Sequence, residues 1–184
     1  MFELSKKCRL EIKWIPRTLN TSADILSKYV DVDDWGISAD VFDQLNTMWR
    51  TFTVDRFANA LNKKVTRFYS RFYEVGCEGT DAFNFSWEGE HNWLVPPLKD
   101  IPRVISILRG GNVSGVLIVP HWPSAAFWPL LRVGLSWHYF ITDIKIYSSD
   151  TGVIVRGSCP FSLIGSGRSN GAMIALKIRS LNVL

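Results

Sequence analysis

The sequence predicts an α/β fold with an open, mainly parallel sheet, and three observations support this class. From Phe52 onward, strand-like and helix-like segments alternate, which is the pattern of strand–helix–strand units. Residues 115–120 (GVLIVP) form a continuous apolar run, typical of a strand buried on both faces of a parallel sheet. Residues 92–95 (NWLV) run into Pro96 and Pro97, and prolines end a strand because they cannot donate to the ladder.

The N-terminal part of the chain is expected to hold one strand and two helices. Residues 9–14 alternate between charged and apolar side chains, which predicts a half-buried strand. After the loop PRTLNTS, Ser22 can cap a short helix over residues 23–27. The acidic stretch DVDDWG follows, so residues 28–37 are interpreted as a linker. Ser38 can cap a second helix. Its apolar face comprises Val41, Phe42, Leu45, Met48 and Trp49.

Four further strands are expected in the larger part of the chain, at residues 52–58, 65–72, 139–147 and 152–157. Residues 99–111 predict a helix, because Asp100 can cap it, Pro102 is tolerated in its first turn and two glycines follow. Residues 123–134 predict a short helix that a Trp-Pro step disturbs. The last dozen residues, after the stretch GSGRSNG, are interpreted as a helix or a frayed tail.

The composition limits the classes of protein to which the chain can belong. The 184 residues are 47% hydrophobic and 21% charged, which excludes a disordered chain. The net charge of +4 and the pI near 9.0 are compatible with a nucleic-acid partner, although the basic residues are dispersed. Cys8, Cys77 and Cys159 are too widely spaced for a disulfide framework or a zinc motif, and isolated thiols suit a reducing compartment.

Membrane and export signals are not apparent. No apolar run approaches the roughly 20 residues that span a bilayer, and the first residues do not have the pattern of a signal peptide. We therefore expect an intracellular protein, in the nucleus or the cytoplasm, without a membrane partner.

The stretch WIPRTLNTSADILS, residues 14–27, contains one candidate metal ligand, Asp24. Two Mg²⁺ ions at a scissile phosphate need several carboxylates from different elements, which a lone Asp cannot supply. An acid in the first turn of a helix also interacts favourably with the helix dipole. The stretch resembles the end of the ribonuclease H domain of retroelement reverse transcriptases. This resemblance implies that Asp24 is the last of four carboxylates that bind two Mg²⁺ ions, with Asn20 and Ala23 in the surrounding pattern.

The same resemblance defines the expected domains. The other three carboxylates would precede residue 1, and Arg17 stands near the place of a loop histidine found in many ribonucleases H. We expect an inactive ribonuclease H remnant at residues 1–29 and a linker and helix at 30–51. A larger domain, whose tail can be frayed, is expected at 52–184.

A series of segments in the larger domain carries a second resemblance. The segments are FTVDRFANALNKKVTRFYSRF (52–72), GTDAF (79–83), NWLVPPLKDIPRVI (92–105) and GVLIVPHWPSAAFWPLL (115–131). In order and spacing, over residues 9–135, the chain resembles DIRS-class (tyrosine-recombinase) retrotransposon polyproteins in the region directly after ribonuclease H. That region is described as similar to phage-type Dam adenine methyltransferases. The resemblance therefore implies a degenerate S-adenosylmethionine methyltransferase fold.

Candidate site residues follow from this resemblance, position by position. Asp55 and residues 54–58 match the turn after the first strand, which borders the cofactor. Asp81 matches an acid on a neighbouring connection. Pro96 and Pro97 match the loop that binds the target amine.

The amine-binding loop of such enzymes normally reads Asp or Asn, Pro, Pro and an aromatic residue. Its oxygens accept hydrogen bonds from the amine, and its ring stacks on the extruded base. Here Val95 offers no acceptor and Leu98 offers no ring. Because the loss of a polar contact made in the transition state lowers rates by orders of magnitude, we expect the loop to be catalytically degenerate. Pro-Pro also occurs in ordinary turns, and Asp55 can be an ordinary strand-end acid.

A basic and aromatic stretch is a candidate surface for single-stranded nucleic acid. Its basic residues are Lys63, Lys64, Arg67 and Arg71, and they are interleaved with Phe68, Tyr69, Phe72 and Tyr73. Alternate aromatic residues on a strand usually belong to the core. His121, in VPHWPS, can act as an acid or base, but it has no identifiable partner nucleophile and is interpreted as a satisfied histidine.

The leading hypothesis is a fragment of a retrotransposon polyprotein that handles nucleic acid, weakly and non-specifically, without catalysis in this chain. Its other partner would be the rest of the polyprotein. The alternative is a DNA adenine methyltransferase that uses S-adenosylmethionine, and the second alternative is a non-functional genomic relic. The family implies Mg²⁺ and S-adenosylmethionine. We expect no working cofactor in this fragment, and weak binding of S-adenosylmethionine near Asp55 without methyl transfer stays open.

Overall fold

The computed structural model describes residues 13–16, 19, 35–149, 152–157, 164 and 171–180. By its internal contacts the chain divides into two compact units, Met1–Val30 and Asp31–Leu184. The linker and helix were expected at residues 30–51. Val30 falls in the first unit, and residues 31–51 fall in the same unit as the larger predicted domain. None of the helices in these described ranges is long and apolar enough to cross a bilayer.

Little of the predicted ribonuclease H remnant lies within the described residues. The amide of Leu19 donates to the carbonyl of Pro16 at 2.9 Å. Lys13 and Trp14 are not in a strand, and the Trp14 side chain is 82% exposed. The prediction of a half-buried strand is thus wrong for these two residues. The remainder of that strand, the helix at 23–27 and the candidate ligand Asp24 lie outside the described residues.

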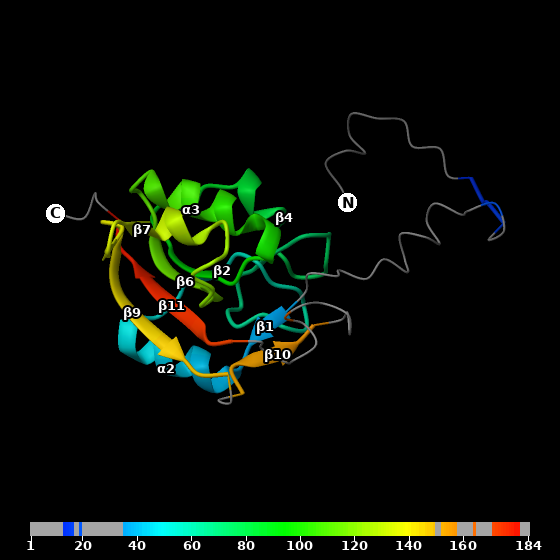
Figure 1. Cartoon of the computed structure of the whole chain (residues 1–184). Helices are drawn as coiled ribbons and strands as arrows, with labels where there is room; N and C mark the ends of the chain where they lie inside the picture. Colours follow the sequence, from blue (N-terminus) through cyan, green and yellow to red (C-terminus); the bar gives the residue numbers. More distant parts are fainter. Residues whose placement is uncertain are drawn as a thin grey trace. The chain divides into compact units, whose positions relative to one another are not determined.

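The second unit is built on a five-stranded sheet with the order β2-β5-β6-β11-β9 (Figure 1). The strands are β2 (Val54–Asp55), β5 (His91–Leu94), β6 (Ser114–Pro120), β11 (Met173–Ile178) and β9 (Ile141–Tyr147). β2, β5 and β6 are parallel to one another, whereas β11 is antiparallel to both β6 and β9. The α/β class is confirmed, but the sheet is mixed rather than mainly parallel.

Strand β11 corrects the interpretation of the C-terminal residues as a helix or a frayed tail. Residues 173–176 are fully buried, and β11 pairs along its whole length with β6, from Met173 opposite Pro120 to Ile178 opposite Gly115. A short apolar run has no periodicity that separates a strand from a helix. Its assignment depends on a partner strand more than fifty residues earlier, which local sequence does not reveal.

Two helices cover opposite faces of the sheet (Figure 1). Helix α3 (Ile101–Arg109) packs in a core that contains Leu117 and Val119 of β6. Helix α2 (Ala39–Trp49) packs in a second core that contains Val116 and Ile118 of the same strand. Successive side chains of a strand point to opposite faces, so β6 is buried on both sides, as its continuous apolar run predicts.

Both helices were expected from the sequence, but details of their ends and faces differ. Ser38 precedes α2 and Asp100 precedes α3, yet neither side chain makes a capping hydrogen bond. Pro102 lies in the first turn of α3, as expected. Met48, assigned to the apolar face of α2, is 50% exposed. One short 3₁₀ turn, η3 (Leu98–Asp100), leads into α3.

Several shorter elements complete the unit, and some replace longer elements expected from the sequence. β1 and β10 form an antiparallel pair, β3 and β4 a parallel pair, and β7 and β8 an antiparallel hairpin. Their bounds are Trp35–Ile37, Ile154–Arg156, Tyr69–Ser70, Gly79–Thr80, Arg132–Val133 and Ser136–Trp137, and the 3₁₀ turns are η2 (Ala82–Asn84) and η4 (Trp128–Leu131). The predicted linker thus contains strand β1. The helix expected at 123–134 is only η4 followed by β7.

A buried polar network fastens β5 to its neighbours. The fully buried Asn92 amide donates to the carbonyls of Trp87 at 2.9 Å and Ser114 at 3.0 Å. Its oxygen accepts from the Arg56 Nε at 2.7 Å. Gly115, opposite Asn92, has a φ of +149°, and a Cβ there would lie 2.0 Å from the Asn92 carbonyl oxygen. Only glycine fits this close approach of two strands.

Gly115→Ala is expected to destabilise the protein because the new Cβ meets the Asn92 backbone and the residue must keep an unfavourable φ. We expect the free energy of unfolding to fall by about 2–4 kcal/mol, measured by urea denaturation. Gly89→Ala is the matched control, because Gly89 also has a positive φ of 74° but its Cβ position is open. The control measures the cost of a positive φ without a close contact, about 1–2 kcal/mol. Equal losses in the two variants would contradict the close-contact explanation.

Candidate binding site at the carboxyl edge of the sheet

The parallel strands β2, β5 and β6 end at one edge of the sheet, where ligands of open α/β sheets usually bind. Asp55 ends β2 and pairs with Trp93 of β5. Pro96 and Pro97 follow β5, and His121 follows β6. The structure therefore brings two groups of predicted site residues, Asp55 and the double proline, to the same edge.

Asp55 is a buried acid. Its side chain is 3% exposed, and its two oxygens accept hydrogen bonds from the amides of Lys64 at 3.0 Å and Phe57 at 3.4 Å. Burial raises the pKa of Asp55 to about 7, and the two amides and the nearby Lys64 charge oppose this rise. At neutral pH the carboxyl group therefore exists in both protonation states.

The space beside Asp55 is closed by strand β1. Trp35 and Ile37 are 4% and 1% exposed, and together with Trp93 and Val95 they line a cavity of only about 10 Å³. A cavity of this size holds about one water molecule, whereas small-molecule sites occupy roughly 300–1,000 Å³. The residues beside Asp55 therefore do not fit S-adenosylmethionine, which the resemblance places there.

The double-proline loop is packed as a structural turn. Val95 is 6% exposed and belongs to the core under α2, and Leu98 packs against both cores. Pro96 is buried, and the carbonyl of Pro97 accepts a hydrogen bond from the Asp100 amide at 2.9 Å. The two positions that would supply an acceptor and a ring in an amine-binding loop thus contribute apolar packing, and the loop starts η3 and α3.

Asp81 shapes the connection before β5. It has a φ of 59°, which is uncommon for a residue other than glycine. Its carboxylate accepts from the Phe83 amide at 3.1 Å, and its own amide donates to the Ser70 carbonyl at 2.9 Å. The turn places Phe83 under the Arg103 guanidinium, 3.7 Å from the ring centre. The Asp81 carboxylate therefore stabilises the turn in which Asp81 lies.

Asp81 also belongs to a charged group near the double proline. Burial raises the pKa of Asp100, and the positive charges of Lys99, Arg71 and Arg103 lower it, while the Asp81 charge adds to the rise. Arg71, a candidate for nucleic-acid binding, thus lies near these acids.

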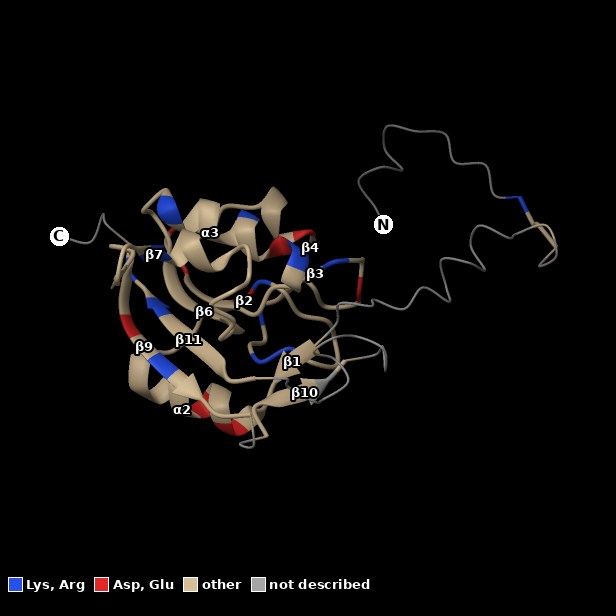
Figure 2. Ribbon diagram, viewed as in Figure 1, with Lys and Arg blue, Asp and Glu red and all other residues tan. Residues whose placement is uncertain are grey.

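The four basic candidates do not form one free cationic surface. Arg67 pairs with Glu78 at 2.6 Å and with Glu90 at 2.9 Å. The Lys63 ammonium lies 4.5 Å above the ring of the buried Phe68. Figure 2 shows basic and acidic residues interspersed over the second unit. Since two carboxylates already neutralise Arg67, this stretch offers less charge to a nucleic acid than its sequence predicts.

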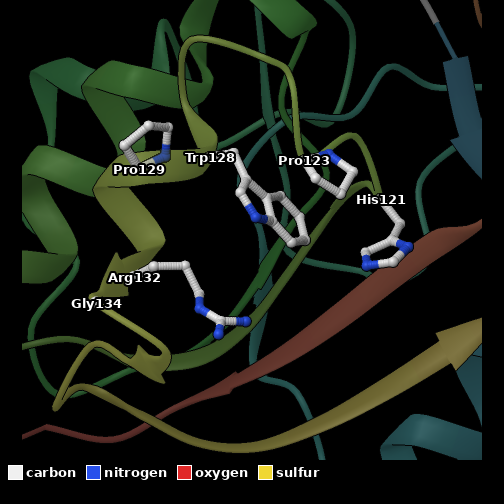
Figure 3. Close-up of a pocket in the computed structure, with 6 residues that line it drawn as sticks. All are labelled: His121, Pro123, Trp128, Pro129, Arg132 and Gly134. Carbon is white, nitrogen blue, oxygen red and sulfur yellow. The ribbon is translucent and has the colours of Figure 1, made fainter.

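An open pocket at the carboxyl end of β6 was not expected from the sequence. It has a volume of about 520 Å³, and Figure 3 shows its lining side chains. They are His121, Pro123, Trp128, Pro129, Arg132 and Gly134. The rings of His121 and Trp128 meet edge to face at 5.0 Å. The signal in the sequence was a cation close to a run of Trp, Pro and His, but only the turn η4 and the β7–β8 hairpin bring the cation and His121 together.

Within the ranges that the structure describes, no group of three or more His, Cys, Asp or Glu side chains is placed to hold a metal ion. The predicted Mg²⁺ ligand Asp24 lies outside those ranges.

Scans against protein-family models and against curated proteins found no match for this chain. The molecule is a mixed α/β protein with a five-stranded sheet. The site geometry must therefore support any function proposed for it.

Asp55 should make the stability of the protein depend on pH. Its pKa rises from 3.8 to about 7 on folding, so between these values the folded state binds more protons than the unfolded state. The resulting stabilisation is complete below about pH 4 and is lost as the pH rises through about 7. Asp55→Asn stays neutral throughout. We expect its free energy of unfolding to fall less steeply over this interval, by up to about 1.4 kcal/mol per pH unit.

The measurement is urea denaturation of both proteins at several pH values. The difference in slope is the readout, because Asn also changes one hydrogen bond at every pH and shifts the whole curve. Parallel curves for the two proteins would show that Asp55 does not titrate in this way.

Proposed function

We propose that this chain handles single-stranded nucleic acid as part of a DIRS-class retroelement polyprotein, and that it transfers no methyl group. The observation that carries the second part is the closure of the sheet edge beside Asp55, where β1 leaves a cavity of about 10 Å³. The first part is supported by the net charge of +4 and by the open, basic pocket beyond β6.

The sheet supports the proposed relation to methyltransferases in one respect. β2 and β5 are adjacent and parallel, so the segments that the resemblance assigns to the cofactor and to the target amine leave the same edge. In a protein that kept this frame without the chemistry, apolar side chains would replace the polar groups of the site. Val95 and Leu98, both packed into cores, have this character.

A working DNA adenine methyltransferase, the alternative function, would need an acceptor for the amine and room for the cofactor. Val95 offers no side-chain acceptor, and the cavity beside Asp55 is smaller than any site for a nucleoside-sized ligand. This geometry favours the non-catalytic proposal. A relic without function differs from both, because it need not bind nucleic acid at all.

The purified full chain is expected to show neither binding of S-adenosylmethionine in calorimetry nor transfer of a labelled methyl group to adenine in DNA. The physical reason is the closed edge beside Asp55. Stoichiometric binding that Asp55→Ala abolishes, together with methyl transfer, would overturn the proposal and establish the methyltransferase.

The full chain is also expected to bind a fluorescein-labelled oligo(dT) of about 20 nucleotides at low salt, measured by fluorescence anisotropy. With two to four phosphate contacts, the logarithm of the affinity should fall against the logarithm of the salt concentration with a slope of roughly −1.4 to −2.8. No binding at 50 mM salt would remove the nucleic-acid function and favour the relic.

A further inference from the structure

We propose that the pocket formed by η4 and the β7–β8 hairpin is where single-stranded nucleic acid binds, with Arg132 on a phosphate and the apolar wall around Trp128 against a base. The inference rests on the proposed function and deepens it, because it moves the contact from the Lys63–Arg71 stretch to this pocket. A volume of about 520 Å³ is within the range of small-ligand sites and accommodates one nucleotide unit.

The cation of the pocket is held in place. Arg132 lies on β7, and the hairpin is closed by the amide of His138, which donates to the Leu131 carbonyl at 2.9 Å. The Arg132 guanidinium lies 4.7 Å above the ring of Trp137 on the paired strand, and its Nη2 donates to the Leu135 carbonyl. Packing on the Trp137 indole fixes the Arg132 side chain. Binding a phosphate therefore costs less conformational entropy than it would for an arginine without such packing.

The Arg132 charge is available to a ligand. Among the described residues it forms no ion pair with a carboxylate, and none of the six lining residues is acidic. A guanidinium has five N–H donors, of which one is used by the Leu135 carbonyl. This is the opposite of Arg67, whose two carboxylate partners leave little charge for a phosphate.

The remaining walls suit a nucleobase. Pro123 and Pro129 give the pocket apolar ring surfaces. Trp128 is 9% exposed, so it adds only a small part of its indole to this wall, and His121 packs edge to face against it at 5.0 Å. Figure 3 shows the His121 ring and the Arg132 guanidinium on either side of the indole. An aromatic wall beside a cation is the combination that single-strand binding sites use for stacking and backbone contact. A base paired inside a duplex cannot enter a pocket that takes one unit, which selects for single strands.

The pocket also lies where the fold favours ligands. His121 directly follows β6, and its amide donates to the Ala172 carbonyl just before β11 at 2.8 Å. The pocket is therefore anchored to two central strands at the carboxyl edge of the parallel part of the sheet. The hairpin beside it exposes Val133 (62%) and Leu135 (94%), which extend the apolar surface away from the cation.

The test compares Arg132→Gln with Lys63→Gln in the full chain, using labelled oligo(dT) and anisotropy at several salt concentrations. Each variant removes one positive charge, but only Arg132 lines the pocket. We expect Arg132→Gln to weaken binding roughly tenfold and to reduce the salt slope by about 0.7, whereas Lys63→Gln should change the affinity less than twofold. Arg132→Lys should restore most of the slope. Circular dichroism and thermal melting establish that each variant is folded.

The outcomes separate this inference from the proposed function. If the wild type binds and both Gln variants lose affinity equally, the contact is diffuse and the pocket assignment is wrong, while the function stands. If the wild type binds nothing at 50 mM salt, the function itself fails.

Thymidine monophosphate should compete with the oligonucleotide at lower concentration than inorganic phosphate does. Equal competition would show that the pocket is an anion site that does not contact a base. Self-association in light scattering that Leu135→Ser abolishes, without competition by oligonucleotide, would assign the face to a protein partner.

Discussion

The burial of β6 on both faces is the constraint on which the rest of the second unit depends. Leu117 and Val119 need a cover on one side, and Val116 and Ile118 need one on the other. Helices α3 and α2 provide these covers, and β5 and β11 satisfy the two hydrogen-bonding edges of the strand. With its two faces and its two edges enclosed in this way, β6 is accessible only at its ends, and His121 is the first residue beyond its carboxyl end.

Strand β1 has the largest consequence for function. Burying two large apolar side chains such as Trp35 and Ile37 stabilises a fold by about 3–6 kcal/mol in total. A cofactor that had to displace them would bind roughly 10²–10⁴-fold more weakly than in a preformed site. The same strand pairs with β10, so its displacement would also break a backbone ladder. The stability of this unit and an open cofactor site beside Asp55 therefore exclude each other.

Elements with a strong local pattern could be predicted from the sequence. The double proline marks the end of β5, the continuous apolar run marks β6, and the apolar spacing of α3 marks its buried face. The sequence does not reveal elements that depend on distant partners. In the sequence, β1 lies in a stretch that is typical of an acidic linker, and β11 lies in a stretch that is typical of a tail. Only the pairing of β1 with β10, and of β11 with β6 and β9, identifies them as strands.

The candidate site likewise contains residues whose position could be predicted from the sequence and one residue whose position could not. Asp55 and the double proline could be placed at one edge because each ends its own strand. Arg132 could not, since its relation to His121 depends on η4 and on a hairpin that the sequence suggested was a helix. Along the carboxyl edge, the region between β2 and β5 is closed by apolar packing, whereas the region beyond β6 is open and holds a cation without a described carboxylate partner. A ligand approaching this edge therefore finds open space beside a cation one strand further along than the resemblance to methyltransferases implies.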